Sequence, residues 1–343
     1  RAIRGLYASP RAPRLLVVDK ENGRKADALN AGLNIATGQL VCAIDADTLI
    51  EPDALVRMVR PFILGGGVLA AGGTIRVANA SEVRSGRVVE SKVPRRPLTG
   101  FQVGEYLRAF LFGRLGWNRL GGNLIISGAF GLFDRESVIR AGGYLHETVG
   151  EDMELVARMR RRSYEEGGPR KVAFVPDPVA WTEAPGSLRV LGRQRDRWHR
   201  GLSDVIWRYR GVLFRPRYRS LGLVVYPYFA FVEFLAPIIE LLGFVGLTAG
   251  LVMGAINWQF AVLFFLAAYG LGLILTLCTL LLEEFSFHRY ETMSDRLWMI
   301  LWAMLENVGY RQTTVIWRVK GIIGYLRKRQ SWGAMERTGF TRS

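Results

Sequence analysis

Two long apolar stretches constrain this chain more than any other feature of its sequence. Residues 234–256 and 258–282 are mostly apolar and are 23 and 25 residues long. A helix of about 20 residues spans the hydrocarbon core of a bilayer, so each stretch is long enough to cross it. The residues around Asn257, between the two stretches, include no lysine or arginine. The sequence therefore predicts a transmembrane hairpin with its tip on the outer side.

The charge of the chain is distributed as the hairpin requires. The 343 residues include 46 Lys and Arg against 30 Asp and Glu, a formal net charge of +16. Almost none of the basic residues falls between residues 221 and 282, whereas both flanks are rich in them. The positive-inside rule places both flanks in the cytoplasm, so we expect a multi-pass protein of the cytoplasmic membrane with a cytosolic catalytic domain. Glu240, inside the first stretch, is expected to avoid lipid.

Composition excludes several classes of protein. Half of the residues are hydrophobic, which excludes a disordered chain. Two cysteines, Cys42 and Cys278, cannot form a disulfide framework or a cysteine-rich zinc site, and three scattered histidines argue against a histidine metal cluster. Nucleic acid is disfavoured as a partner because the basic residues flank apolar stretches and form no known recognition module. Phospholipid headgroups and phosphorylated substrates remain as anionic partners.

The first 200 residues have the pattern of an α/β domain. Apolar runs at 14–19 and 40–45 predict buried strands, and the alanine and leucine spacing of residues 25–36 predicts a helix between them. Alternating strands and helices at short spacing predict a mostly parallel sheet flanked by helices. Further strands are expected at 67–79, 123–133 and 171–177, and a basic, tryptophan-bearing amphipathic helix at 188–210.

The sequence divides into four predicted parts. Residues 1–187 form the cytosolic catalytic domain, and residues 188–233 form amphipathic or interfacial helices. The transmembrane hairpin covers 234–282. Residues 283–343 form a juxtamembrane or interfacial helix and a basic cytosolic tail. Within this part, residues 297–319 are too polar for a lipid-facing span, so we expect one interfacial or bundle-buried helix there.

Two aspartates directly follow a predicted strand. Asp45 and Asp47 are two residues apart, so in an extended segment their side chains point the same way and can meet one hard cation, Mg²⁺ or Mn²⁺. A pair of aspartates at this spacing arises by chance about once in a chain of this size. Their place at the end of a strand, where open α/β sheets bind ligands, favours a functional role.

A second acidic motif lies at a predicted helix start. Glu151 and Asp152 follow a glycine-rich bend. A carboxylate there could take a proton from an acceptor hydroxyl as a general base. The alternative is that Asp152 only caps the helix, and this triplet taken alone supports the cap at least as well.

The basic helix carries a candidate ligand-binding set. Arg197 offers donors suited to a diphosphate, Trp198 offers a flat apolar face for a sugar, and Gln194 lies one turn earlier. The alternative is a solvated basic face near anionic lipid, with the tryptophan as an interfacial anchor.

Three smaller signals accompany these motifs. Lys25, in the first turn of a predicted helix, could meet phosphate or be an ordinary surface lysine. Ser127 and Gly128 follow a predicted strand, where small residues would let a bulky ligand approach or would simply allow tight packing.

The order of these motifs carries more information than any one of them. K-A-D-A-L-N at 25–30 precedes D-A-D at 45–47, S-G-A at 127–129, G-E-D at 150–152 and Q-R-D-R-W at 194–198. With the membrane helices that follow, this order resembles the processive family-2 glycosyltransferases, which include the cellulose, chitin, hyaluronan and poly-N-acetylglucosamine synthases. The resemblance covers about residues 15–282, and Q-x-x-R-W after an acidic triplet is its most specific part.

The resemblance implies a GT-A fold, a nucleotide diphosphate sugar as donor (usually a UDP-sugar) and a divalent cation, Mg²⁺ or Mn²⁺. It implies that Asp152 is the general base and that Glu151 is its neighbour. The implied donor site contains Lys25, Asp45, Asp47 and Arg197, with the two aspartates also holding the metal. The implied acceptor site contains Ser127, Gly128, Gln194 and Trp198.

One departure from the family pattern concerns the start of the chain. The family opens with a strand ending in a V-P-x-Y-N-E type segment and an acidic pair that contacts the nucleobase, and neither precedes Arg14. Thirteen residues are too few for a βαβ unit. We therefore expect that the first βα unit of the donor site is missing and that these 343 residues alone bind UDP-sugar poorly.

The sequence thus predicts a metal-dependent, membrane-bound hexosyltransferase that extends a polysaccharide, with coupled export as a further possibility. A non-processive transferase acting on a lipid or a single acceptor is the nearer alternative. A non-enzymatic basic membrane scaffold is the other.

Overall fold

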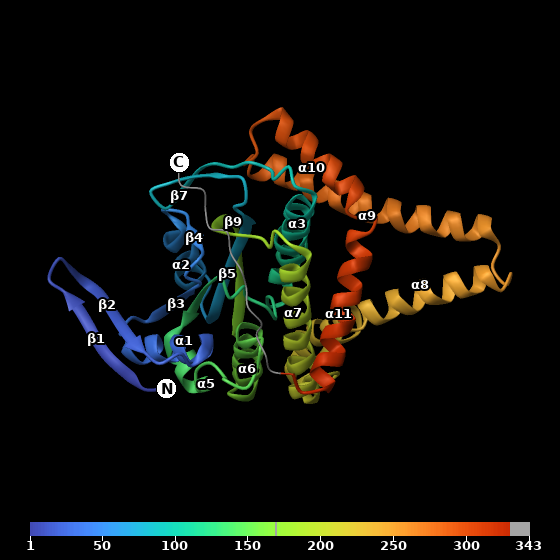
Figure 1. Ribbon diagram of the computed structural model, residues 1–343. Helices are drawn as coiled ribbons and strands as arrows, with labels where there is room; N and C mark the ends of the chain where they lie inside the picture. The colour runs from blue at the N-terminus through green and yellow to red at the C-terminus, as the bar shows by residue number, and fades with distance from the viewer. Residues whose placement is uncertain (169, 330–343) are drawn as a thin grey trace.

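The computed structural model describes residues 1–168 and 170–329 (Figure 1). Its centre is a five-stranded sheet, and three of the four strand pairs are antiparallel while β5 and β9 pair in parallel. The predicted α/β class is confirmed, but the sheet is mixed rather than mostly parallel. An apolar run has the same pattern in a buried strand of either direction, so the pattern cannot distinguish them. The strand order is β3 (Leu40–Ile44), β8 (Phe130–Asp134), β5 (Val68–Val77), β9 (Lys171–Thr182) and β4 (Leu49–Ile50).

Helices cover both faces of the sheet. Successive residues of β5 point to opposite faces. Ala70 packs in the cluster that includes helices α1 and α6, whereas Ala71 packs in the cluster that includes α2 and α3. The first face is covered by α1 (Arg24–Ile35), α5 (Arg135–Ala141) and α6 (Glu151–Glu165), and the second by α2 (Ala54–Leu64) and α3 (Pro97–Leu107).

The first predicted strand forms, but it is not buried. Residues 14–19 lie in β2 (Ala12–Lys20), which pairs with β1 (Ile3–Ser9) in a separate antiparallel ribbon. Leu15 and Val17 are 57% and 51% exposed. The prediction of a buried strand is therefore wrong, because this apolar run does not pair with the central sheet. Figure 1 shows the ribbon projecting from the body of the protein.

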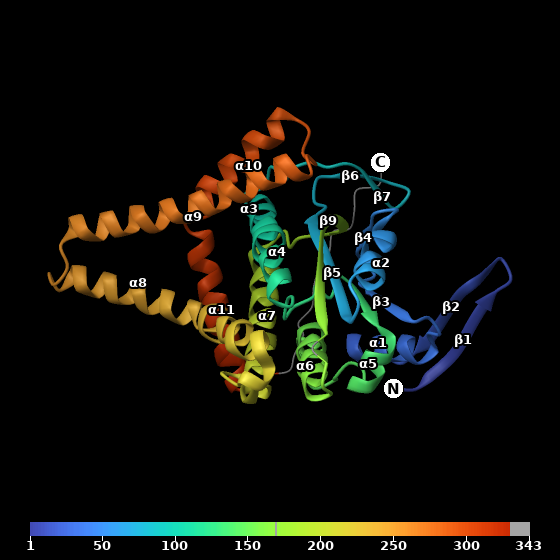
Figure 2. The same cartoon turned by 180° about the vertical axis from the view of Figure 1, so that it is seen from behind.

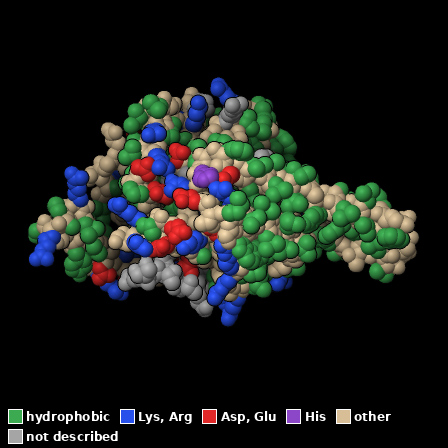
Figure 3. Space-filling view, turned by 90° about the horizontal axis from the view of Figure 1, so that it is seen from above, with side chains coloured by type: hydrophobic (Ala, Val, Ile, Leu, Met, Phe, Trp, Pro, Cys, Tyr) green, Lys and Arg blue, Asp and Glu red, His purple; other side chains and the backbone are tan. Residues whose placement is uncertain are grey.

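The predicted hairpin of apolar helices is present. Leu221–Val252 and Trp258–Ser286 are long and apolar enough to cross a membrane, and only 6% and 11% of their most apolar windows are buried. A core helix of a soluble protein would be buried on most sides. In Figures 1 and 2, α8 (Ala236–Val252) and α9 (Trp258–Ser286) project together from the body of the protein. Figure 3 shows no charged side chains at the projecting end of the hairpin.

The single helix predicted over 297–319 is wrong, because the chain forms two. α10 (Met293–Leu305) and α11 (Tyr310–Leu326) are separated by a turn in which Gly309 has a φ of +84°, a conformation that favours glycine. The amphipathic helix predicted at 188–210 is confirmed as α7 (Leu188–Arg208). α11 packs along it.

Shorter elements complete the described chain. They are the ribbon strands β6 (Glu82–Arg84) and β7 (Arg87–Glu90), the short helix α4 (Leu115–Trp117), the π-helical segments Arg108–Arg114, Leu221–Val225 and Tyr228–Phe234, and the 3₁₀ turns Asn118–Leu120, Arg210–Val212 and Pro216–Tyr218.

A buried ion pair joins the sheet to the hairpin. Arg76 of β5 donates a hydrogen bond to Glu283 near the end of α9, and their side chains are 0% and 2% exposed. The rings of Trp181, Phe287 and Tyr290 surround the guanidinium at 5.8 to 5.9 Å. Each charge is thus sheltered from water and depends on the other for compensation.

We predict that Glu283→Gln lowers the free energy of unfolding by about 3 to 5 kcal/mol, because it leaves the buried Arg76 without a counter-charge. Thermal unfolding in detergent micelles measures the change. Glu82→Gln, which removes the exposed pair with Arg84, is the control and should cost less than about 1 kcal/mol. Equal losses in the two variants would contradict the prediction.

Candidate active site

One large pocket contains every predicted site residue. Its volume is about 760 Å³. It is formed where the end of β3, the segment before β8, the start of α6 and the middle of α7 meet. The ten predicted site residues all line it: Lys25, Asp45, Asp47, Ser127, Gly128, Glu151, Asp152, Gln194, Arg197 and Trp198.

Asp45 and Lys25 form the charged centre of the pocket. The backbone N–H of Asp45 donates to Ala129 O at 3.1 Å, which ties the end of β3 to the 127–129 loop. Asp45 Oδ1 lies 2.5 Å from Lys25 Nζ, and this ammonium also donates to Gly128 O at 2.9 Å. Lys25 is therefore part of the site and not an ordinary surface lysine.

Lys25 sits among several carboxylates. Its Nζ lies 3.8 Å from Glu151 Oε1. Burial pushes the pKa of Lys25 down, but the negative charges of Asp45, Asp152 and Glu151 outweigh burial and leave the pKa above its ordinary value. The lysine is thus a permanent positive charge that makes a crowded acidic cluster tolerable.

Asp152 is not the N-cap residue of α6, which is Gly150. Its carboxylate accepts hydrogen bonds from two backbone N–H groups. Oδ1 accepts from Met153 at 2.8 Å in the first turn of α6, and Oδ2 accepts from Gly128 at 2.9 Å. The carboxylate therefore binds the start of the helix, in line with the capping alternative, and it is also held against the loop that binds Lys25.

Glu151 lies beside Asp152 in a drier place. It is 4% exposed. Burial first, and then repulsion from Asp152, raises the pKa of Glu151 to about 7, although Lys25 and Arg197 act in the opposite direction.

Two glycines bring α7 against this acidic cluster. A Cβ added to Gly150 would lie 2.9 Å from Gly201 Cα, and one added to Gly201 would lie 3.0 Å from Gly150 Cα. These distances are too short for any side chain at either position. The start of α6 and the middle of α7 can therefore approach this closely only with glycine at both positions.

The contact places the α7 motif over the carboxylates. Burial lowers the pKa of Arg197, while the nearby negative charges of Glu151, Asp152 and Asp45 oppose the shift. Arg197 lines the same pocket as these carboxylates. Gln194 is 6% exposed and Trp198 is 46% exposed. Because the motif lines the pocket beside buried carboxylates, a purely lipid-facing basic surface does not describe this part of the helix.

The family model described as glycosyltransferase like family 2 matches residues 6–201. The chain belongs to this family. The matched region includes all ten predicted site residues.

Curated relatives of this glycosyltransferase make polysaccharide. A poly-β-1,6-N-acetyl-D-glucosamine synthase of Staphylococcus epidermidis is 26% identical over 250 residues, covering 72% of this chain and 56% of that protein. The synthase of the same name from Staphylococcus aureus strain COL is 28% identical over 189 residues, covering 55% and 41%. The chain thus spans about half the length of the curated relatives it matches.

A solved glycosyltransferase has the same fold. The mannosyltransferase PcManGT of Pyrobaculum calidifontis, solved in complex with GDP-Man and Mn²⁺, superposes with a TM-score of 0.53 at 18% identity. The match covers 91% of this chain and 69% of that one. It confirms the predicted GT-A-like architecture.

The pocket of this family member fits a divalent cation by its chemistry. Asp45 and Asp47 offer oxygen ligands, which Mg²⁺ and Mn²⁺ prefer. Within residues 1–168 and 170–329, no group of three or more His, Cys, Asp or Glu side chains is arranged to hold a metal. A cation here would thus take two protein carboxylates and complete its shell with phosphate and water oxygens, an arrangement that suits Mg²⁺.

The sequence reasoning missed one wall of the pocket. Glu105 and Arg114, from α3 and the π-helical segment that follows it, line the pocket together with Thr314 and Arg318 of α11. Arg195, inside the predicted motif, was also not singled out. These residues lie far apart in sequence, so no local pattern links them. One signal was available: Glu105 is the one charged residue of the 101–107 segment.

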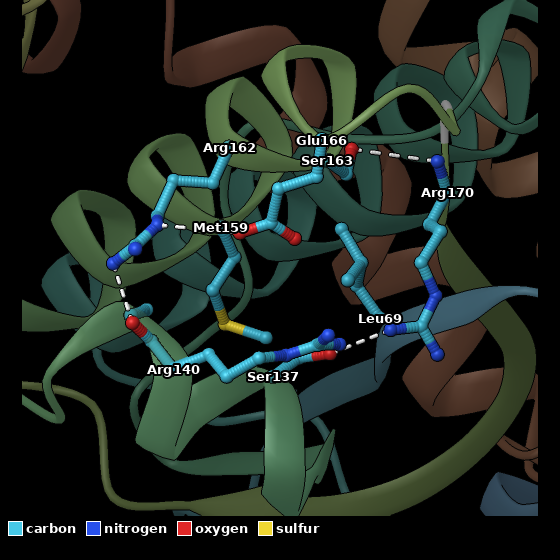
Figure 4. A pocket seen from close by; sticks show the side chains of 9 residues that line it. Leu69, Ser137, Arg140, Met159, Arg162, Ser163, Glu166 and Arg170 are labelled. Atoms are coloured by element: carbon cyan, nitrogen blue, oxygen red, sulfur yellow. Dashed lines mark hydrogen bonds and ion pairs between the residues drawn. The ribbon is translucent and has the colours of Figure 1, made fainter.

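A second, smaller pocket is a packing feature. It encloses about 20 Å³ between α5, α6 and the start of β9 (Figure 4). Its arginines are bound to their neighbours: Arg162 Nε lies 3.6 Å from Glu166 Oε1, and Arg170 Nη1 donates to Ser137 Oγ at 2.6 Å. Its size and internal pairing leave no room for a sugar nucleotide.

We predict that Glu151 makes the protein less stable as the pH rises from about 4.5 to 7. Its pKa in the fold lies above its unfolded value, so the folded state holds a proton that the unfolded state has lost. The stabilisation present below pH 4.5 is lost as the pH passes 7, by up to about 3 kcal/mol.

Thermal unfolding at pH 5 and pH 7.5 measures this loss. Glu151→Gln, which cannot ionise, should remove most of the difference between the two pH values. Glu166→Gln, at an exposed position of the same helix, should leave it unchanged. A wild-type difference that survives in Glu151→Gln would contradict the assignment.

Proposed function

We propose that the chain is a membrane-bound inverting glycosyltransferase that moves a sugar from a nucleotide diphosphate sugar to a growing polysaccharide. The observation that carries the proposal is the convergence of Asp45, Asp47 and Asp152 in one pocket beneath Arg197 and Trp198. A membrane scaffold would need no such convergence of carboxylates around a lysine.

The pocket residues suit a single in-line displacement. Asp152 would take the proton of the acceptor hydroxyl as its oxygen attacks the anomeric carbon and the bond to the diphosphate breaks. The Gly128 N–H that binds Asp152 Oδ2 at 2.9 Å would keep this base in place. Glu151, which is buried beside Lys25, is less suited to reach an acceptor.

The cations of the pocket suit the other side of the reaction. Arg197 would stabilise the negative charge that develops on the leaving diphosphate, and Lys25 would contact the donor. Asp45 and Asp47 would hold a Mg²⁺ or Mn²⁺ ion, which supplies further charge stabilisation when bound. Gln194 and Trp198, with the small residues Ser127 and Gly128, would receive the acceptor sugar.

We infer that UDP-N-acetylglucosamine is the first donor to test. The Staphylococcus relatives are named as synthases of poly-β-1,6-N-acetyl-D-glucosamine. The solved neighbour holds GDP-Man with Mn²⁺, so GDP-mannose is the second donor to test. Transfer to a lipid or a single acceptor is the alternative reading, and product length distinguishes the two.

We also propose that the hairpin spans the cytoplasmic membrane with the pocket on the cytosolic side. In this proposal residues 1–187 are cytosolic and the interfacial part starts at residue 188, while the first apolar span starts at Leu221, before the predicted boundary at residue 234. A basic loop supports this orientation. Arg215 and Arg219 are exposed just before the apolar segment that starts at Leu221, and within the described chain neither forms an ion pair or a side-chain hydrogen bond. The exposed Phe214 of this loop stacks on Phe231 at 5.8 Å.

We predict that Asp152→Asn lowers sugar transfer at least about a hundredfold, because the amide cannot accept the acceptor proton. Membranes carrying the full chain are incubated with labelled UDP-N-acetylglucosamine or GDP-mannose, a β-1,6-linked N-acetylglucosamine oligosaccharide, and Mg²⁺, Mn²⁺ or EDTA. Label transferred to the oligosaccharide is then measured.

Asp53→Asn is the matched control, since Asp53 is an exposed aspartate on the same domain. It should transfer sugar as the wild type does. Full activity of Asp152→Asn would remove Asp152 as the base. Because weak donor binding is expected for these 343 residues, the donor concentration is raised until the rate no longer increases. Absence of transfer from both donors by the wild type under that condition would count against the proposed reaction.

A further inference from the structure

Arg195 lies directly behind the tryptophan of the proposed acceptor site. It is three residues before Trp198 on α7, so both side chains lie on one side of the helix. The guanidinium carbon lies 4.4 Å from the centroid of the Trp198 ring. Arg195 is 3% exposed, whereas Trp198 is 46% exposed. The arginine thus covers part of the ring from inside the protein while the rest of it remains open.

Two other elements hold this arginine. Nη2 of Arg195 donates to Glu105 Oε2 of α3 at 2.7 Å. The hydroxyl of Tyr310, the first residue of α11, donates to the same carboxylate oxygen at 2.6 Å. Tyr310 also packs against Phe101 of α3, with ring centroids 5.1 Å apart. The guanidinium is therefore fixed by a carboxylate that is itself shared between two helices.

Burying the Arg195 guanidinium costs free energy that a purely structural contact would not require. Nε and Nη1 of Arg195 are buried, and neither has a hydrogen-bond partner in the described part of the chain. Buried donors are normally paired, because each unpaired group loses its hydration without compensation. Leucine or methionine would pack here without this cost. Besides its ion pair with Glu105, the contact that distinguishes this guanidinium is its position over the Trp198 ring.

We propose that Arg195, held by Glu105 and Tyr310, is a positioning residue that fixes the Trp198 ring to receive an acceptor sugar. This inference rests on the proposed function. A sugar stacks on an indole only when the ring is presented face-on, and a half-exposed tryptophan has other orientations available. A flat cation stacked behind the ring favours one of them before the acceptor arrives.

The alternative is that Arg195 serves only as the counter-charge of Glu105. That role would stabilise the fold and would affect donor and acceptor steps alike. A positioning role acts through Trp198, so it should affect the acceptor step and vanish when Trp198 is absent. The two roles thus differ in what a second substitution does.

The test uses the full chain in membranes with the same β-1,6-linked oligosaccharide as acceptor. The donor is UDP-N-acetylglucosamine, or GDP-mannose if GDP-mannose is the only donor from which transfer is seen. Arg195→Ala should raise the KM for the oligosaccharide about tenfold. It should leave unchanged the KM for the donor and the rate at which donor is hydrolysed by water. Arg195→Lys, which can still pair with Glu105 but cannot stack as a plane, should fall between Arg195→Ala and the wild type. Arg189→Ala, an exposed arginine of the same helix, is the matched control and should behave as the wild type.

The deciding variant is the double substitution. Arg195→Ala added to Trp198→Ala should have no further effect on the oligosaccharide KM, because the ring that it positions is gone. Additive effects, or an equal loss of donor hydrolysis, would overturn the positioning role. If Arg195→Ala does not fold, Glu105→Gln and Tyr310→Phe provide the same comparison with smaller changes. If wild-type transfer itself is absent, the proposed function fails and not this inference.

Discussion

The candidate active-site pocket depends on one partly buried cation. Lys25 lies within 4 Å of the carboxylates of Asp45 and Glu151 and binds the loop that holds Asp152. Three carboxylates this close repel one another. The positive charges of Lys25 and Arg197 offset that repulsion. Lys25 also joins the start of α1, the end of β3 and the start of α6, so the geometry of the site follows from a charge balance and not from shape alone.

The cations of α7 can reach the carboxylates because α7 approaches the start of α6 closely, which only small residues permit. Gly150 and Gly201 touch through their backbones, and a methyl group at either would collide with the other. This contact lets α7 lie across the mouth of the acidic cluster. Arg197 and Trp198 reach the pocket for that reason. Lys25 thus allows the carboxylates to lie close together, and the glycine pair brings the basic helix α7 to them.

The residues that line the pocket could be picked out because each follows a local signal and because the order of the signals resembles a known family, while their roles are proposals. Asp45 follows an apolar strand, Glu151 begins a helix, and Trp198 lies on a strongly amphipathic one. Strand direction and the exposure of β2 could not be predicted, because an apolar run does not reveal its neighbours. Contacts such as Glu105 with Arg195 and Tyr310 join residues 90 and 205 positions apart. Such pairings depend on how helices pack, which no window of the sequence contains.

The packing of α11 connects the pocket to the membrane hairpin. This helix runs along α7, lines the pocket through Thr314 and Arg318, and reaches α8 through Arg311, which lies 3.0 Å from Glu240. The pairing explains how a carboxylate is tolerated in an apolar segment. One wall of the pocket is therefore built by helices that also border the hairpin. Under the proposed function, this wall would place the acceptor side of the pocket next to the apolar hairpin.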